Sequence, residues 1–364
     1  MHFGAQREVL LRPLQQVIGV VEKRQTLPVL ANVLLQLQGS RLTLTTSDLE
    51  VELASSAEVD VQQEGELTIP ARKLFDLVRA LPDGAGVDIA QQAERVVMRA
   101  GRSRYTLATL PAAEFPQSET GDVVDRFVVP QSSLKQLIEA TGFAMAVQDV
   151  RFYLNGLLLE RRGEGLRAVA TDGHRLALAD WDAGSDAGRQ VILPRKGVLE
   201  LQRLLDADEG DVELVFTRNH LRVAIGDSVL VSKLIDGRFP DYEAVIPVAA
   251  DVPVAVEREE LKAALLRAAI LSNEKYRGIR VELAEDLLRI SAHNPEQEEA
   301  VEEIGAQCAA QSWSIGFNVN YVLDALNALG TDQVVLRLRD GNSSVLLESP
   351  ETRARRHVVM PLRL

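Results

Sequence analysis

The feature that most constrains this 364-residue sequence is an internal repeat with an offset of 124 residues. The segment LPAAEFP at 110–116 returns as LIDGRFP at 234–240, and Asp48 corresponds to Asp172. The segments IPARKLFDLVRAL, LPRKGVLELQRLL and FNVNYVLDALNAL begin at residues 69, 193 and 317. Several landmarks recur after the same offset, and some of them recur a second time. This pattern indicates three copies of one domain, each of a size that is common among protein domains. We place these domains at residues 1–124, 125–246 and 247–364.

Each copy has the same predicted order of elements. A first helix is predicted from apolar residues at i, i+3 and i+4 spacing in 7–24, 130–146 and 257–271. Pro13 is compatible with the first of these helices if it lies in the first turn. Alternating strands follow, then a second helix with Leu74 and Val78 on one face, then further strands. The predicted fold class is α+β, with two helices packed on antiparallel sheets in each copy.

Composition narrows the class of protein. The formal net charge is −13, which by itself argues against a nucleic-acid binder because phosphate contacts need Lys and Arg. The basic residues, however, concentrate on the predicted helices; they include Arg7, Arg12, Lys135, Lys262, Arg267, Arg79 and Arg203. The single cysteine, Cys308, excludes a disulfide framework and a CxxC site. With no apolar run of membrane length and no signal peptide, we expect a cytoplasmic protein.

Two predicted strands carry opposite charge. The segment at 101–110 contains Arg102 and Arg104, and the segment at 295–304 is rich in glutamate. If both are edge strands, the first copy of one molecule could pair with the third copy of another, and a repeated head-to-tail contact gives a ring or a fibre. Two unrelated charged edges are the alternative.

The segment ATDGHRLAL at 170–178 allows three interpretations. Asp172 and His174 could be catalytic partners, although no nucleophile motif accompanies them and the first copy has no histidine at the matching position. They could bind a metal, but the five histidines of the chain form no ligand-type pair. The third interpretation is an Asp-Gly turn capped by the aspartate.

Several segments together resemble the bacterial sliding clamp family, the beta subunit of DNA polymerase III. They are RQTLPVLANVLL (24–35), QDVRFYLNG (148–156), ATDGHRLAL (170–178), LPRKG (193–197), DGRFPDY (236–242), AAILSNEKYRG (268–278), NPEQEEA (294–300) and VVMPLRL (358–364). The resemblance covers the whole chain. It implies a non-enzymatic processivity factor, a ring-shaped head-to-tail homodimer whose helices line a central hole around duplex DNA. It also implies partners that bind through short linear motifs: the replicative polymerase, the clamp loader, translesion polymerases and repair factors.

The resemblance further implies three sets of residues, and no cofactor or metal. The peptide-binding pocket would contain Leu154, Thr171, Gly173, His174, Arg175, Leu176, Pro240, Val245, Asn318, Tyr321, Ser344, Val358, Met360, Pro361, Leu362 and Arg363. The DNA contacts would be Arg24, Arg72, Gln148, Tyr153, Arg195, Lys196 and Tyr276. The dimer interface would join Lys73, Arg102, Arg104, Tyr105 and Leu107 to Ile270, Leu271, Glu296, Glu298, Glu299 and Glu302. Glu243 and Ala244 depart from the basic residues expected after DGRFPDY, which puts the pocket rim in question.

Two other functions stay open from the sequence. One is a monomeric adaptor built of three repeated domains. The other is a hydrolase that uses Asp172 and His174.

Overall fold

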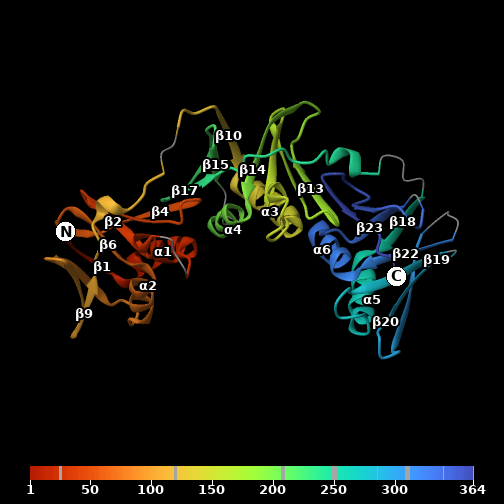
Figure 1. The fold of residues 1–364 in the computed structure, drawn as a ribbon, viewed down its shortest axis with the longest axis horizontal. Helices are drawn as coiled ribbons and strands as arrows, with labels where there is room; N and C mark the ends of the chain where they lie inside the picture. The colour runs from red at the N-terminus through yellow and green to blue at the C-terminus, as the bar shows by residue number, and fades with distance from the viewer. Residues whose placement is uncertain are drawn as a thin grey trace. The chain divides into compact units, whose positions relative to one another are not determined.

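The computed structural model describes residues 1–23, 27–118, 121–205, 210–247, 252–284, 286–307, 312–338 and 340–363 (Figure 1). Arg24 and Cys308 lie outside these residues. The chain forms two compact units, one from residues 1–135 and 196–234 and the other from residues 136–195 and 235–364. The central copy therefore contributes one part to each unit.

The three copies share one order of elements, except that the first copy has two short strands before its second helix where each of the others has one. The first copy contains β1 (His2–Gln6), α1 (Arg7–Val17), β2 (Asn32–Gln38), β3 (Arg41–Ser47), β4 (Val51–Glu58), β5 (Asp60–Gln63), β6 (Gly65–Pro70), α2 (Ala71–Ala80), β7 (Gly86–Gln92), β8 (Arg95–Ala100) and β9 (Ser103–Ala108). The second contains β10 (Asp125–Pro130), α3 (Gln131–Thr141), β11 (Gly156–Arg162), β12 (Gly165–Thr171), β13 (Arg175–Trp181), β14 (Ala187–Pro194), α4 (Arg195–Leu204), β15 (Asp211–Phe216), β16 (His220–Ile225) and β17 (Ser228–Lys233). The third contains β18 (Val252–Glu257), α5 (Arg258–Ile270), β19 (Gly278–Ala284), β20 (Leu287–His293), β21 (Glu299–Gly305), β22 (Trp313–Asn318), α6 (Val319–Leu329), β23 (Gln333–Leu338), β24 (Val345–Glu348) and β25 (Arg355–Val359). Helices α2, α4 and α6 begin at residues 71, 195 and 319, so the predicted offset of 124 residues is confirmed.

The strands of the described residues form four antiparallel sheets. The unit that holds the first copy contains the sheets β5-β1-β7-β8-β9 and β10-β15-β16-β17-β4-β3-β2-β6. The unit that holds the third copy contains β14-β11-β12-β13-β25-β24-β23-β18 and β21-β20-β19-β22. Each eight-stranded sheet joins two copies, through β17 and β4 in one case and through β25 and β13 in the other. Strands β9 and β21 are left as sheet edges, as expected for the two charged segments.

The first helix is shorter than its apolar pattern predicts, and its proline lies at a different position in the helix than expected. Helix α1 ends at Val17, and Leu10, Leu14 and Val17 are buried. Pro13 lies inside the helix, not in its first turn, so that expectation is wrong. Because proline has no N–H, the helical hydrogen bond from position 13 to the carbonyl of Val9 cannot form. Burial of Pro13 in the apolar face of α1 accounts for its presence there.

The repeated Phe-Pro motif has a packing role. Phe115 packs against Val29 and Leu34 of the first copy. Phe239 belongs to the corresponding cluster of the second copy, with Leu158. The motif therefore anchors the segment that leaves each copy against a sheet. No helix among the described residues has the length and apolar character needed to cross a membrane.

Candidate functional site

The turn that precedes β13 is held by an aspartate. The Asp172 carboxylate accepts hydrogen bonds from the backbone N–H of His174 at 2.9 Å and of Arg175 at 3.0 Å. Gly173 has φ +88°, a left-handed conformation that favours glycine. Asp48 accepts the same bonds in the first copy, from Glu50 at 2.9 Å and from the residue after it at 2.7 Å. The capped-turn interpretation of this segment is confirmed, and the Asp172 carboxylate is already engaged.

Arg175 contacts residues of both the second and the third copy. Its guanidinium donates to the Phe143 carbonyl at 2.7 Å, to Asp172 at 3.2 Å and to Asp324. Its Cζ atom also lies over the Tyr321 ring, 4.7 Å from the ring centroid, and over the Phe143 ring, 5.2 Å from the centroid. The His174 ring lies parallel to Tyr321, with centroids 6.4 Å apart. Cation–π contacts of this kind fix the position of both aromatic rings.

These residues border an open hollow of about 420 Å³. Its lining consists of Phe143, Met145, Ala146, Val147, Asp149, Asp172, His174, Arg175, Arg195 and Tyr321. Hydrogen bonds from Arg151 lower the pKa of Asp149 to about 2, so this carboxylate is ionised near neutral pH. A methionine, aromatic rings and a few fixed polar groups are the usual lining of a site that accepts several short peptides.

An apolar cluster lies beside the hollow, where β13 pairs with β25. Leu176 is opposite Val358 in this pairing, and both are buried. Tyr153 and Val245 pack against the same cluster. The backbone N–H of Met360 donates to the carbonyl of His174 at 2.9 Å, so the end of the chain is fixed beside the turn.

The predicted pocket residues divide into three groups. His174, Arg175 and Tyr321 line the hollow, and Leu176, Val245 and Val358 belong to the apolar cluster. The remaining predicted residues line neither the hollow nor the apolar cluster; they are Leu154, Thr171, Gly173, Pro240, Asn318, Ser344, Met360, Pro361, Leu362 and Arg363. Leu154 is buried, and the Thr171 hydroxyl donates to the Arg175 carbonyl at 2.6 Å. Asn318 caps α6, and the Leu362 N–H donates to the Gly316 carbonyl. Sequence reasoning missed Phe143, Met145 and Asp149. The segment GFAMA (142–146) was predicted as the end of the first helix of the second copy, which in the structure ends at Thr141.

Glu243 lies away from the hollow. Its carboxylate accepts from Arg162 at 2.5 Å and from Arg167 at 3.2 Å. The neighbouring Tyr242 hydroxyl donates to the buried Glu160 at 2.5 Å. Burial, together with this hydrogen bond, raises the pKa of Tyr242. The acidic departure at position 243 thus has two arginine partners on the sheet, and it holds the connector that carries Val245.

The predicted DNA contacts differ in how free their side chains are. Gln148 and Tyr276 are exposed, and Tyr153 is half-buried. Arg72 is exposed, but its guanidinium donates to the Val21 carbonyl at 2.5 Å. Lys196 is bound to Asp48, to Glu22 at 2.8 Å and to the Val20 carbonyl at 3.0 Å. Arg195 donates to the Met145 carbonyl at 3.4 Å. Other helix cations are also paired, such as Arg203 with Glu200 at 2.6 Å, so fewer of them face solvent than the sequence pattern predicts.

The two predicted interface segments lie at the free edges, each within its own unit. On β9 and the turn before it Arg102 and Arg104 are exposed, Tyr105 is half-buried and Leu107 is 8% exposed; Lys73 is exposed on α2. Ile270 is 76% exposed at the end of α5, beside the half-buried Leu271. Arg267 holds Glu302 through two hydrogen bonds, of 2.9 and 2.6 Å, which lower the pKa of Glu302. Glu296, Glu298 and Glu299 are exposed.

Comparison with known proteins gives consistent matches over the whole chain. Residues 1–119, 128–241 and 243–363 match models of the N-terminal, central and C-terminal domains of the DNA polymerase III beta subunit. The beta sliding clamps of Pseudomonas aeruginosa and Escherichia coli are 52% and 48% identical to this chain, with 100% of each sequence covered. A crystal structure of the Pseudomonas aeruginosa beta subunit superposes with a TM-score of 0.96 at 52% identity, again with 100% of both chains covered. The Caulobacter crescentus beta subunit gives a TM-score of 0.95 at 36% identity over 100% of both chains.

Proposed function

Because the chain belongs to the family of DNA polymerase III beta subunits, the beta sliding clamps, we propose that two copies close head to tail into a ring around duplex DNA. Membership of this family makes the protein a DNA sliding clamp, a non-catalytic processivity factor of DNA replication. The chain would divide into domains at 1–124, 125–246 and 247–364. It would act in the cytoplasm.

The observation that carries the ring is the repeated use of one kind of sheet junction. The last strand of the second copy pairs with β4, and the last strand of the third copy pairs with β13. Strand β9 is the last strand of the first copy, as β17 and β25 are of the second and third copies. Strand β21 holds the place in the third copy that β4 and β13 hold in the first and second. Both are free edges in the described chain. Two molecules that pair β9 with β21 in both directions would use the same junction six times and leave neither of these two strands as an open edge.

The internal junctions also predict the register of this pairing. Ser228 lies opposite Ser55, and Ser103 and Glu302 are the matching residues on β9 and β21. Ser103 of one molecule would therefore lie opposite Glu302 of the partner subunit. Arg102 and Arg104 would then share a face with Glu299 and Glu303 of the partner subunit. Opposite charges across neighbouring strands stabilise a sheet and select its partner.

Duplex DNA would pass through the ring without base-specific contacts. The proposed contact residues are Arg24, Arg72, Gln148, Tyr153, Arg195, Lys196 and Tyr276, of which Arg24 lies outside the described residues. Weak, salt-dependent phosphate contacts allow a protein to slide. Net acidity of the chain is compatible with this function, because a closed ring is retained by its topology rather than by tight binding.

The hollow beside Arg175 and the apolar cluster next to it would bind client peptides. Clients would be the replicative polymerase, the clamp loader, translesion polymerases and repair factors, through short motifs with a glutamine and bulky apolar residues. One Pseudomonas aeruginosa clamp, 52% identical with a TM-score of 0.96, has been solved bound to griselimycin. That structure supports a ligand-binding site in the family.

The ring can be tested by retention on DNA. The protein is loaded onto a nicked circular duplex with a clamp loader and ATP, the complex is isolated, and the circle is cut once. Release after cutting is the expected result, because a ring slides off a free end. Retention after cutting would mean ordinary surface binding and would contradict the topological link. A mass near 40.0 kDa at micromolar concentration would instead support the monomeric adaptor.

A further inference from the structure

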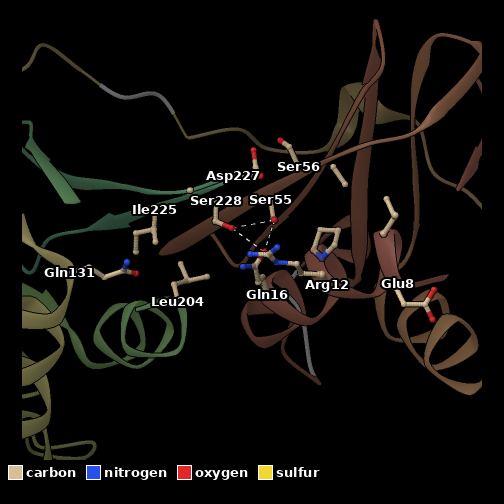
Figure 2. Close-up of a pocket in the computed structure, with 14 residues that line it drawn as sticks. Glu8, Arg12, Gln16, Ser55, Ser56, Gln131, Leu204, Ile225, Asp227 and Ser228 are labelled. Atoms are coloured by element: carbon tan, nitrogen blue, oxygen red, sulfur yellow. Dashed lines mark hydrogen bonds between the residues drawn. The ribbon is translucent and has the colours of Figure 1, made fainter. Parts of the chain in front are cut away.

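A polar pocket of about 350 Å³ lies where β4 pairs with β17, within the unit that holds the first copy (Figure 2). Its walls come from α1, β4, the turn at 226–227, the end of α4 and Gln131. The Gln16 side-chain oxygen accepts hydrogen bonds from Ser55 at 2.6 Å and from Ser228 at 3.0 Å, as Figure 2 shows. This pocket shares no lining residue with the hollow beside Arg175.

The second internal junction shows what normally fills this place. Ala179 lies opposite Arg355 there, in the positions that Ser55 and Ser228 hold at the first junction. The Arg355 guanidinium donates to the Ala328 carbonyl at 2.9 Å and to the Gln136 side-chain oxygen at 3.2 Å. The second junction is therefore closed by an arginine of the chain itself.

The free edge at β21 is filled in a related way. Arg267 of α5 and Glu302 of β21 occupy the positions that Gln16 and Ser55 hold in the first copy, and they form an ion pair of 2.6 Å. The Ser228 side chain is too short to make the hydrogen bonds that Arg355 makes at the second junction. Gln16 is neutral, whereas α5 has Arg267 at the matching position. The first junction therefore lacks the side chains that occupy the other two places, and a hollow lies there.

Two hydrogen-bond donors of the pocket are unused within the described chain. Neither the Arg12 guanidinium nor the Gln16 side-chain nitrogen has an acceptor among the residues that the structure describes. The two carboxylates at the rim are engaged, Glu8 by Arg7 at 3.1 Å and Asp227 by Arg41 at 3.2 Å. A ligand that fits must therefore accept hydrogen bonds and carry negative charge near Arg12.

We propose that this pocket binds a carboxylate, either from a free small molecule or from an acidic side chain of a partner protein. The planar carboxylate would take two N–H groups of Arg12, as in other arginine–carboxylate forks, and one N–H of Gln16. A single negative charge suits the site better than a phosphate dianion, because Glu8 and Asp227 at the rim would repel the second charge. The volume lies at the small end of the range for ligand sites.

The test is a titration followed by NMR of protein labelled with ¹⁵N-glutamine. Sodium butyrate serves as the free carboxylate, and the blocked peptide Ac-Gly-Glu-Gly-NH₂ serves as the acidic side chain. The expected result is a saturable shift of the Gln16 side-chain amide with one or both probes. The probe with the tighter binding identifies the source.

Two variants copy the second junction and act as matched controls. Arg12→Gln installs the residue found at position 136 and should weaken binding about tenfold or more, because a charge-assisted hydrogen bond is lost. Arg12→Gln combined with Ser228→Arg supplies both residues of the second junction, where Arg355 donates to Gln136, and should abolish the shift by closing the pocket. Unchanged resonances of the glutamines outside the pocket would show that both variants are folded. The absence of a saturable shift, or an equal shift in Arg12→Gln, would overturn the proposal, as would a larger shift with inorganic phosphate or a short DNA duplex.

Discussion

At the scale of single residues, Arg175 is the side chain on which the proposed peptide site depends most. It binds Asp172, Asp324 and the Phe143 carbonyl and stacks on Tyr321. Arg175→Met should weaken binding of a fluorescent client peptide about tenfold or more in an anisotropy titration, since hydrogen bonds to charged groups are lost. Arg353→Met, at a side chain that is 78% exposed, should have no effect. Equal affinities for both variants would remove Arg175 from the site.

His357 makes a pH-dependent prediction. It is buried, and neither ring nitrogen has a hydrogen-bond partner in the described part of the chain. Burial, reinforced by the charge of Arg355, lowers the pKa of His357 to about 3. The unfolded chain protonates His357 below about pH 6.5, whereas the folded chain does so only near pH 3. As the pH falls through this window, the unfolding free energy should therefore decrease by roughly 1.4 kcal/mol per pH unit.

The same prediction can be isolated by substitution. His357→Phe keeps an aromatic ring next to Phe143, whose centroid lies 5.7 Å away, and removes the titration. Urea unfolding between pH 7.5 and 5 should then show a flatter acid limb than the unaltered protein, because carboxylates titrate mainly below this range. Parallel pH profiles for the two proteins would show that His357 does not govern the loss.

At the scale of elements, the connector after β17 is held by the pairing of Glu243 with Arg162 and Arg167. Glu243→Lys would place three cations together and release Val245 from the apolar cluster. We expect a loss of about 1–2 kcal/mol in the unfolding free energy, because Glu243 is half-exposed, and a measurable loss of peptide affinity. Glu243→Gln should have a smaller effect on both, and Asp236→Lys on the same connector should have none. A loss of stability with unchanged affinity would deny Glu243 a role in positioning the pocket.

The elements themselves could be predicted from the sequence, but their contacts could not. Helical spacing located α2, α4 and α6 because Leu74 and its counterparts must face a core, and the offset of the repeat reinforced each assignment. Nothing in the local pattern links Arg175 to Asp324, which lies 149 residues away, or Arg162 to Glu243, 81 residues away. Such pairs arise when β13 joins β25 and when the connector folds back on its sheet. That is why Phe143 and Met145 were missed while the Asp172 turn, which is local, was recognised.

At the scale of the whole molecule, the edges β9 and β21 predict how the dimer can be opened. Arg102→Glu with Arg104→Glu would place like charges beside Glu299 and Glu303 of the partner subunit. The dimer dissociation constant should rise about tenfold to a hundredfold at low salt, and less at high salt, because exposed charges are screened. Sedimentation would detect the monomer of 40.0 kDa. Arg95→Glu, on the neighbouring strand but away from the edge, should leave the dimer intact.

Charge reversal on the opposite edge makes the prediction specific to head-to-tail pairing. Glu299→Arg with Glu303→Arg should also yield monomers when present alone, because both junctions of its ring would carry like charges. A mixture of the two altered chains is different. One junction of the mixed dimer would carry the exchanged charges and the other would be unaltered, so both would be complementary. The mixture should therefore sediment as a dimer of one chain of each kind. Monomers in the mixture would mean that β9 does not pair with β21. The single variants exclude an interface that joins β9 to β9 or β21 to β21, because such an interface carries like charges in the unaltered protein as well and would not be weakened when the charges are reversed.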